Sequence, residues 1–308
     1  MAIDETVVSD LTLSRGMIVR YWGALRKGGL ARLPENGPLP RDLPDRSYLW
    51  PHLAYSSNPA AALEAHPIAR WLDFERQEFE GMPMPDPLRF LERLGSGKSD
   101  KFSYCERERV RQAPNDKLSQ ALDLIRSVWP LAAAELSDSV LGVAWIESEK
   151  GRIKTPKGQV ESSSDPKRFG VIHLNAEYFR AVSSFEVATA LIHESAHHCL
   201  FVETAIDALI PEDFKTPVYS PLRREMRPAI GVLHAVFTTA RIGQWARRLL
   251  DEAPGEDASR EVARISREYI VGYRAALGEL ERLRFSPRGM KVLQAMQGSV
   301  TELESLHG

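Results

Sequence analysis

Residues 190–200 read ALIHESAHHCL and contain the pattern HExxH, formed by His193, Glu194 and His197. Residues four apart lie on one face of an α-helix, so the two imidazoles can bind one metal ion together. Glu194 points to an adjacent angle, from which its carboxylate can reach a metal-bound water. The pattern therefore predicts a metal site, and most helices with this pattern belong to zinc peptidases.

A complete site needs a third ligand, and the sequence offers three candidates. His234 lies in the apolar run AIGVLHAVF, where a lone histidine is ordinarily a hydrogen-bonded core residue, but the HExxH helix in the same chain favours a ligand role. Glu203 and Glu225 are the alternatives, because peptidases of the thermolysin type take a glutamate from a following helix. His198 lies about 100° around the helix from its neighbour His197, which fits packing better than ligation.

Arginines flank His234 on the same predicted helix face. Arg227 and Arg241 lie seven residues before and after it, near two helical turns, and Thr238 lies four residues after it. An arginine near a metal suits a carboxylate held by two parallel hydrogen bonds, on a substrate or on a 2-oxoacid cosubstrate. Arg223 and Arg224 enlarge the choice, and at least one of Arg241 and Arg224 is expected to be an ordinary surface charge.

The elements that position these residues are mostly helical. A small sheet is expected directly before the motif helix, so the fold class is mainly α with a small β-sheet (α+β). We expect strands at 140–147 and 171–174, a helix that bends or ends at Pro130, a motif helix from the capping-box residue Ser183 to about Leu209, a polar loop at 211–227, and helices at 228–250 and 258–283. The last of these could pack within the chain or against a second copy in a homodimer.

Composition narrows the classes of function. The 308 residues are 43% hydrophobic with a net charge of -2, which gives no support for nucleic-acid binding through a basic surface. Two cysteines make no disulfide framework, and neither a signal peptide nor a membrane span is evident. We expect a soluble cytoplasmic protein. Its N-terminal region, 1–130, is largely helical and extended, and its metal-binding catalytic region is 131–308, unless the two form one continuous domain.

The motifs also resemble a known family. The combination LIHESAHH and RREMRPAIGVLHAVF is similar to the HExxH-motif peptide-modification proteins found with ribosomally made, modified peptides, over roughly residues 138–250. The resemblance implies an iron(II)- and α-ketoglutarate-dependent oxygenase that uses O2 to hydroxylate a β-carbon of a precursor peptide. It implies His193, His197 and His234 as metal ligands and Arg227 as the first choice for the distal carboxylate of α-ketoglutarate. Glu194 would then orient water, accept a hydrogen bond or support the ligands.

The main alternative is a zinc-dependent metallopeptidase in which Glu194 is the general base. Both hypotheses expect a zincin-like arrangement of the HExxH helix, because the same helix presents the metal. The third ligand discriminates between them: His234 favours the oxygenase, and Glu203 or Glu225 favours the peptidase. In the oxygenase, the strand GVIHLN could pair with an extended peptide by strand addition.

Overall fold

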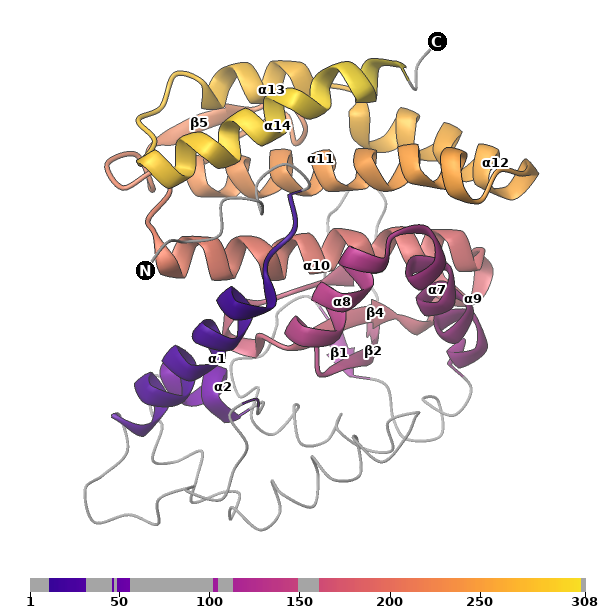
Figure 1. The fold of residues 1–308 in the computed structure, drawn as a ribbon, viewed down its shortest axis with the longest axis horizontal. Coiled ribbons are helices and arrows are strands. Elements are labelled where there is room, and N and C mark those ends of the chain that lie inside the picture. Colours follow the sequence, from indigo (N-terminus) through magenta and orange to yellow (C-terminus); the bar gives the residue numbers. More distant parts are fainter. Residues whose placement is uncertain are drawn as a thin grey trace. The chain divides into compact units, whose positions relative to one another are not determined.

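The computed structural model describes residues 11–31, 46, 49–55, 102–104, 113–148 and 161–305 (Figure 1). Its contacts divide the chain into two compact units. The helical unit comprises Met1–Met17, Gln120–Leu136 and Ser184–Gly308, and the sheet unit comprises Ile18–Ser119 and Ser137–Ser183. This division differs from the predicted boundary at residue 130, because both units take segments from each half of the chain. Every predicted site residue belongs to the helical unit.

Among its described residues, the sheet unit contains four strands in the order β1-β2-β4-β3. Their bounds are Phe102–Tyr104 for β1, Gly142–Ser148 for β2, Ser162–Ser163 for β3 and Val171–Asn175 for β4. β2 and β4 are parallel, and the other two pairs are antiparallel. All five residues of β4 are buried, as expected for a strand between two others. The strands predicted at 140–147 and 171–174 are thus confirmed, as is the α+β fold class.

The interior position of β4 corrects one expectation. β2 pairs with the whole of β4 on one side, and β3 pairs with His173 and Leu174 on the other. Asn175 also donates its backbone N–H to Glu161 on the β3 side. The backbone of His173–Asn175 on this side is therefore already paired, so a peptide added to β4 there would have to displace β3.

The sheet unit also contains helical segments, and the first of them begins in the helical unit. They are α1 (Arg15–Leu30), α2 (Leu49–Tyr55), the 3-10 turn η2 (Pro166–Arg168) and α9 (Ala176–Ala181). Trp22 of α1 packs edge-on against Phe169, with ring centroids 4.9 Å apart. The next residue, Gly170, has φ 97°, and a Cβ there would lie 2.9 Å from the Trp22 ring. Only glycine tolerates both the positive φ and the close approach of the Trp22 ring, so Gly170 allows this part of the core to pack tightly.

Helices build the other unit almost entirely. Its elements are α10 (Ser184–Ile206), β5 (Pro217–Ser220), β6 (Glu225–Pro228), α11 (Ala229–Glu252), α12 (Glu256–Ile265), η3 (Ser266–Ile270), α13 (Tyr273–Leu280) and α14 (Pro287–Ser305). α7 (Asn115–Val128) and α8 (Pro130–Ser139) contribute residues to both units, and the predicted break at Pro130 is confirmed. α11 is the central helix, with α10 along one side and α12, α13 and α14 packed on it (Figure 1).

Two regions of the helical unit differ from expectation. The predicted polar loop at 211–227 contains the antiparallel hairpin β5–β6, which leads directly into α11 at Pro228. The helix predicted at 258–283 is interrupted: α12 passes into η3, a π-helical turn, and Gly272 then adopts a left-handed conformation with φ 88°. Amphipathic periodicity does not reveal either the wide turn or the break.

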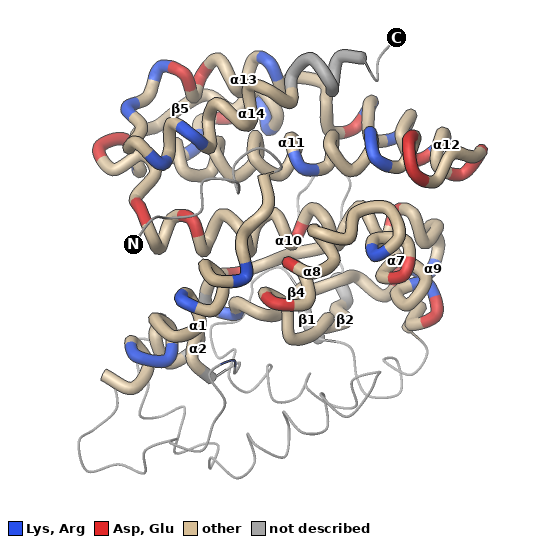
Figure 2. Tube along the Cα trace, in the orientation of Figure 1, with Lys and Arg blue, Asp and Glu red and all other residues tan. Residues whose placement is uncertain are grey.

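Charged residues of both signs occur along the described helices. Figure 2 shows acidic and basic positions alternating along α12, where Arg260 pairs with Glu256 at 3.0 Å. Such pairs within one exposed helix contribute only a few tenths of a kcal/mol each. None of the described helices combines the length and the apolar character that crossing a bilayer would require.

Candidate metal centre

The structure brings three histidines of the helical unit together. His193 and His197 lie one turn apart on α10, with ring centroids 5.0 Å apart. His234 reaches them from α11: its ring is stacked on His197 at 5.2 Å, and the two Nδ1 atoms are 2.9 Å apart. Phe201 packs against His234 at 5.3 Å on the α10 side. We call His193, His197 and His234 the histidine cluster.

The surroundings of the histidine cluster keep its imidazoles neutral. Desolvation, followed by the charge of Arg223, lowers the pKa of His193 to about 4. Desolvation, followed by the charge of Arg227, does the same to the pKa of His234, to about 4. The pKa of His197 falls well below its ordinary value through desolvation and the neighbouring histidines. At neutral pH each ring therefore has one nitrogen lone pair, the form that binds metal ions.

The nitrogen atoms partly fit a metal ion. Facing neutral nitrogens at 2.9 Å in His197 and His234 either share one N–H or direct their lone pairs to one cation. Nδ1 of His193 is buried and has no hydrogen-bond partner among the described residues, which is costly for a polar atom. Within the parts of the chain that the structure describes, no group of three His, Cys, Asp or Glu side chains is arranged as a metal site as it stands.

The remaining polar residues of α10 beside the cluster are buried. Glu194 is 2% exposed, next to His193 in the chain. His198 is fully buried, and its Nδ1 lies 3.0 Å from the backbone oxygen of Glu194. The ring of His198 therefore packs in the core of the helical unit, as its position about 100° around the helix from His197 predicts.

The two carboxylates considered as peptidase-type ligands are paired with arginines. Glu203 is buried and forms a two-pronged ion pair with Arg288, in which Nη2 donates to Oε1 at 2.9 Å. The Glu225 side chain is 61% exposed and lies 3.6 Å from Nε of Arg227. His234, in contrast, lies directly against the HExxH residue His197. The contacts thus favour His234 as the third member of the site.

Two of the predicted arginines lie where they influence the cluster. Arg223 is in the turn of the β5–β6 hairpin and is exposed, and its charge acts on His193 and His197. Arg227 is on β6, half-buried, and its charge acts on His234. Both are therefore available to a negatively charged ligand beside the histidines.

The other two predicted cofactor-binding residues have core contacts instead. Arg241 is fully buried, and its Nη1 lies 2.8 Å from Oε1 of Glu135 and 2.7 Å from Sγ of Cys199. Thr238 is 2% exposed, and its hydroxyl donates to the backbone oxygen of Ala235 in its own helix. These contacts argue against a cofactor-binding role for both, and against a surface position for Arg241. That two residues share a helix face can be predicted from their spacing, but how deeply each side chain is buried cannot.

One neighbour of the cluster was missed in the sequence. Tyr269 of η3 lies against His193, with ring centroids 6.1 Å apart. No motif marks it, since its position depends on the π-helical turn.

Comparison with known proteins adds no family assignment. Neither the protein-family models nor the curated proteins searched contain a match to this chain. The similarity to the peptide-modification family therefore stays a prediction from the two motifs.

Proposed function

We propose that this chain is an iron(II)- and α-ketoglutarate-dependent oxygenase that hydroxylates a β-carbon of a residue in a ribosomally synthesised peptide. The observation that supports it most is the contact between His234 and His197. Glu203, a carboxylate alternative, is paired with Arg288 instead. A three-histidine set is what the oxygenase hypothesis expects, and a carboxylate in third place is what the peptidase hypothesis expects.

The histidine cluster would hold the iron. Its neutral imidazoles need no deprotonation before they bind, so they are suited to a divalent cation at neutral pH. The chemistry that iron and α-ketoglutarate supply together is the oxidation of a C–H bond to C–OH by O2, as α-ketoglutarate becomes succinate and CO2. One oxygen atom of O2 enters the peptide and the other enters succinate.

Arg227 is the residue we assign to the distal carboxylate of α-ketoglutarate. Its guanidinium lies over the first turn of α11, where a Cβ on Gly231 would come within 3.7 Å of its Nε. Gly231 and His234 are three residues apart on one face of α11, so the guanidinium and the metal ligand share that face. Arg227 pairs with the exposed Glu225, whose Oε1 lies 3.6 Å from its Nε. This ion pair is weak, so an incoming carboxylate can replace Glu225. Arg223 adds positive charge that acts on His193 and His197 of α10.

Glu194 supports the ligands in this proposal rather than activating water for hydrolysis. Its buried carboxylate is adjacent to His193 and can accept a hydrogen bond from a bound water or a substrate amide. We further propose a zincin-like presentation of α10 and a cytoplasmic protein whose partner is a precursor peptide rather than a nucleic acid.

The test is anaerobic reconstitution with iron(II), α-ketoglutarate and a candidate precursor peptide, followed by O2. The expected result is a peptide mass gain of one oxygen atom with an equal amount of succinate. Peptide cleavage with zinc and without α-ketoglutarate would instead support the metallopeptidase.

A pair of variants tests the arginine assignment. Arg227→Gln should raise the KM for α-ketoglutarate at least about tenfold, because a charge-assisted pair is lost, while metal content stays the same. Arg247 on α11 is half-exposed and pairs with Asp251 in the same helix, so Arg247→Gln is the matched control and should leave this KM unchanged.

A further inference from the structure

Tyr269 lies against the histidine cluster and a partly buried arginine at the same time. Its ring centroid lies 6.1 Å from that of His193, with the planes inclined at 55°. The guanidinium carbon of Arg264 lies 5.7 Å from the centroid of the same ring. An arginine within about 6 Å of an aromatic ring is attracted by the negative charge of the ring face. The tyrosine ring thus connects a cation to a proposed metal ligand.

The π-helical turn makes this contact possible. Tyr269 lies five residues after Arg264, which would place it about 140° around a regular α-helix, away from the arginine. η3 has the wider π geometry, in which residues five apart are hydrogen-bonded neighbours along the helix. The inserted turn therefore returns Tyr269 to the side of Arg264. Such turns are rare, and they occur frequently at functional sites.

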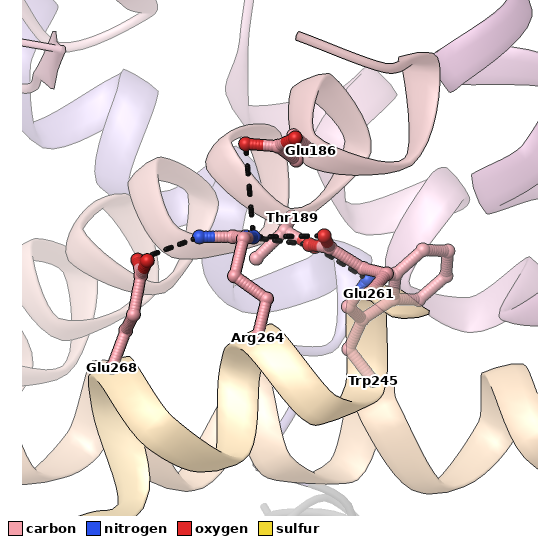
Figure 3. A network of polar contacts seen from close by, with 6 residues as sticks. All are labelled: Glu186, Thr189, Trp245, Glu261, Arg264 and Glu268. Carbon is pink, nitrogen blue, oxygen red and sulfur yellow. Dashed lines mark hydrogen bonds and ion pairs between the residues drawn. The ribbon is translucent and has the colours of Figure 1, made fainter. Parts of the chain in front are cut away.

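A network of polar contacts fixes Arg264 in place (Figure 3). Its side chain is 15% exposed; Nε donates to Oε2 of Glu261 at 2.8 Å, and Nη2 donates to Oε1 at 2.5 Å. Nη1 pairs with Glu268 at 2.8 Å, and Glu186 of α10 lies 3.7 Å from Nε. All three carboxylates converge on one guanidinium, so its orientation is defined from α10, α12 and η3 together.

The same network is joined to α10 by a second contact. The hydroxyl of Thr189 donates to Glu261 at 2.5 Å, and Trp245 of α11 donates its indole N–H to Thr189 at 3.0 Å. Thr189 lies one turn before His193 on the same face of α10. One face of α10 therefore contacts the network and carries the proposed ligand.

We infer that Tyr269 is a positioning residue of the metal centre, whose ring sets the orientation of His193 and is itself held by Arg264. This inference rests on the proposed metal binding by the histidine cluster. The aromatic ring lies next to both His193 and Arg264, so the proposed positioning role is assigned to the ring. Mutating a hydrogen-bonding group that orients a metal-binding histidine typically costs about 10–100-fold in metal affinity, and we expect loss of a packing contact to act in the same direction.

The experiment is a titration of the full-length, metal-free protein with cobalt(II), whose visible absorption reports the arrangement of its ligands. Tyr269→Leu should weaken cobalt(II) binding about tenfold and alter the absorption spectrum. Tyr269→Phe keeps the ring and should retain both wild-type properties. Each variant is also unfolded thermally without metal, so that a loss of fold is recognised separately.

Arg264→Gln should shift cobalt(II) affinity in the same direction as Tyr269→Leu. Arg260→Gln is the matched control on α12, because Arg260 is 68% exposed and pairs with Glu256 in its own helix. It should bind cobalt(II) as the wild type does.

The outcomes separate this inference from the function on which it rests. If the wild type binds no cobalt(II), or if His234→Ala binds it equally well, the proposed metal centre is wrong and this inference is wrong with it. If the histidines are needed but a folded Tyr269→Leu variant keeps wild-type affinity and spectrum, the role of Tyr269 alone is overturned.

Discussion

Arg241→Met should severely destabilise the protein without acting through a bound cofactor. Arg241 and Glu135 are both fully buried, and Nη1 contacts both carboxylate oxygens, at 2.8 and 3.0 Å. The same nitrogen donates to the backbone oxygen of Leu11 at 3.0 Å, and Glu135 accepts the backbone N–H of Leu13 at 2.7 Å. The ion pair thus also fixes the segment that precedes α1 within the helical unit.

The magnitude follows from the charge that remains. Methionine fills most of the volume of arginine but leaves the buried Glu135 carboxylate without the opposite charge of Arg241. Breaking a buried ion pair in this way costs about 3–5 kcal/mol of unfolding free energy. The double variant Arg241→Met/Glu135→Leu removes both charges and should recover most of that loss. Arg247→Met, on the half-exposed pair with Asp251, is the matched control and should cost about 0–1 kcal/mol.

The assay is urea unfolding of the metal-free protein, followed by tryptophan fluorescence, because Trp129 and Trp245 are buried in the helical unit. The free energy of unfolding is compared among the wild type, the two single variants and the double variant. A loss below about 1 kcal/mol for Arg241→Met, or a double variant as unstable as the single one, would refute the argument that losing the opposite charge beside Glu135 dominates.

Two further predictions concern packing and reactivity. Gly289→Ala should lower the unfolding free energy by about 1–3 kcal/mol in the same assay, because a Cβ there would lie 2.2 Å from the backbone oxygen of Leu209. Gly298→Ala on the same helix meets no atom within 4 Å and should be neutral or stabilising; equal losses for both would contradict the packing argument. Cys199 is buried, which raises the pKa of its thiol well above the ordinary value. In a Cys105→Ser background it should therefore resist thiol reagents at pH 8 until the protein is unfolded, and rapid labelling of the folded protein would disprove this.

Much of the fold was predictable because it depends on local pattern. Apolar periodicity identified α10 and α11, and β-branched runs identified β2 and β4. The proximity of His234 to the HExxH helix was also expected, because the two HExxH histidines need a third ligand and His234 is the strongest candidate in the sequence. Its role as a ligand stays a prediction.

The remainder depends on tertiary context. The sequence of the β5–β6 hairpin has little alternation of apolar and polar residues, so the sequence predicts a loop there. The hairpin nevertheless positions Arg227. Tyr269 reaches the site through one π-helical turn, which periodicity does not report. Arg241 lies on a predictable helix face, but its burial beside Glu135 depends on α8, more than a hundred residues earlier.

The central claim is that a metal is bound by histidines from α10 and α11, with no carboxylate in third place. The most direct test is the iron content of the wild type, His234→Ala and Glu225→Gln after anaerobic equilibrium dialysis against iron(II). The account predicts stoichiometric iron in the wild type and in Glu225→Gln, and its loss in a folded His234→Ala. Iron retained by His234→Ala, or lost from Glu225→Gln, would contradict it.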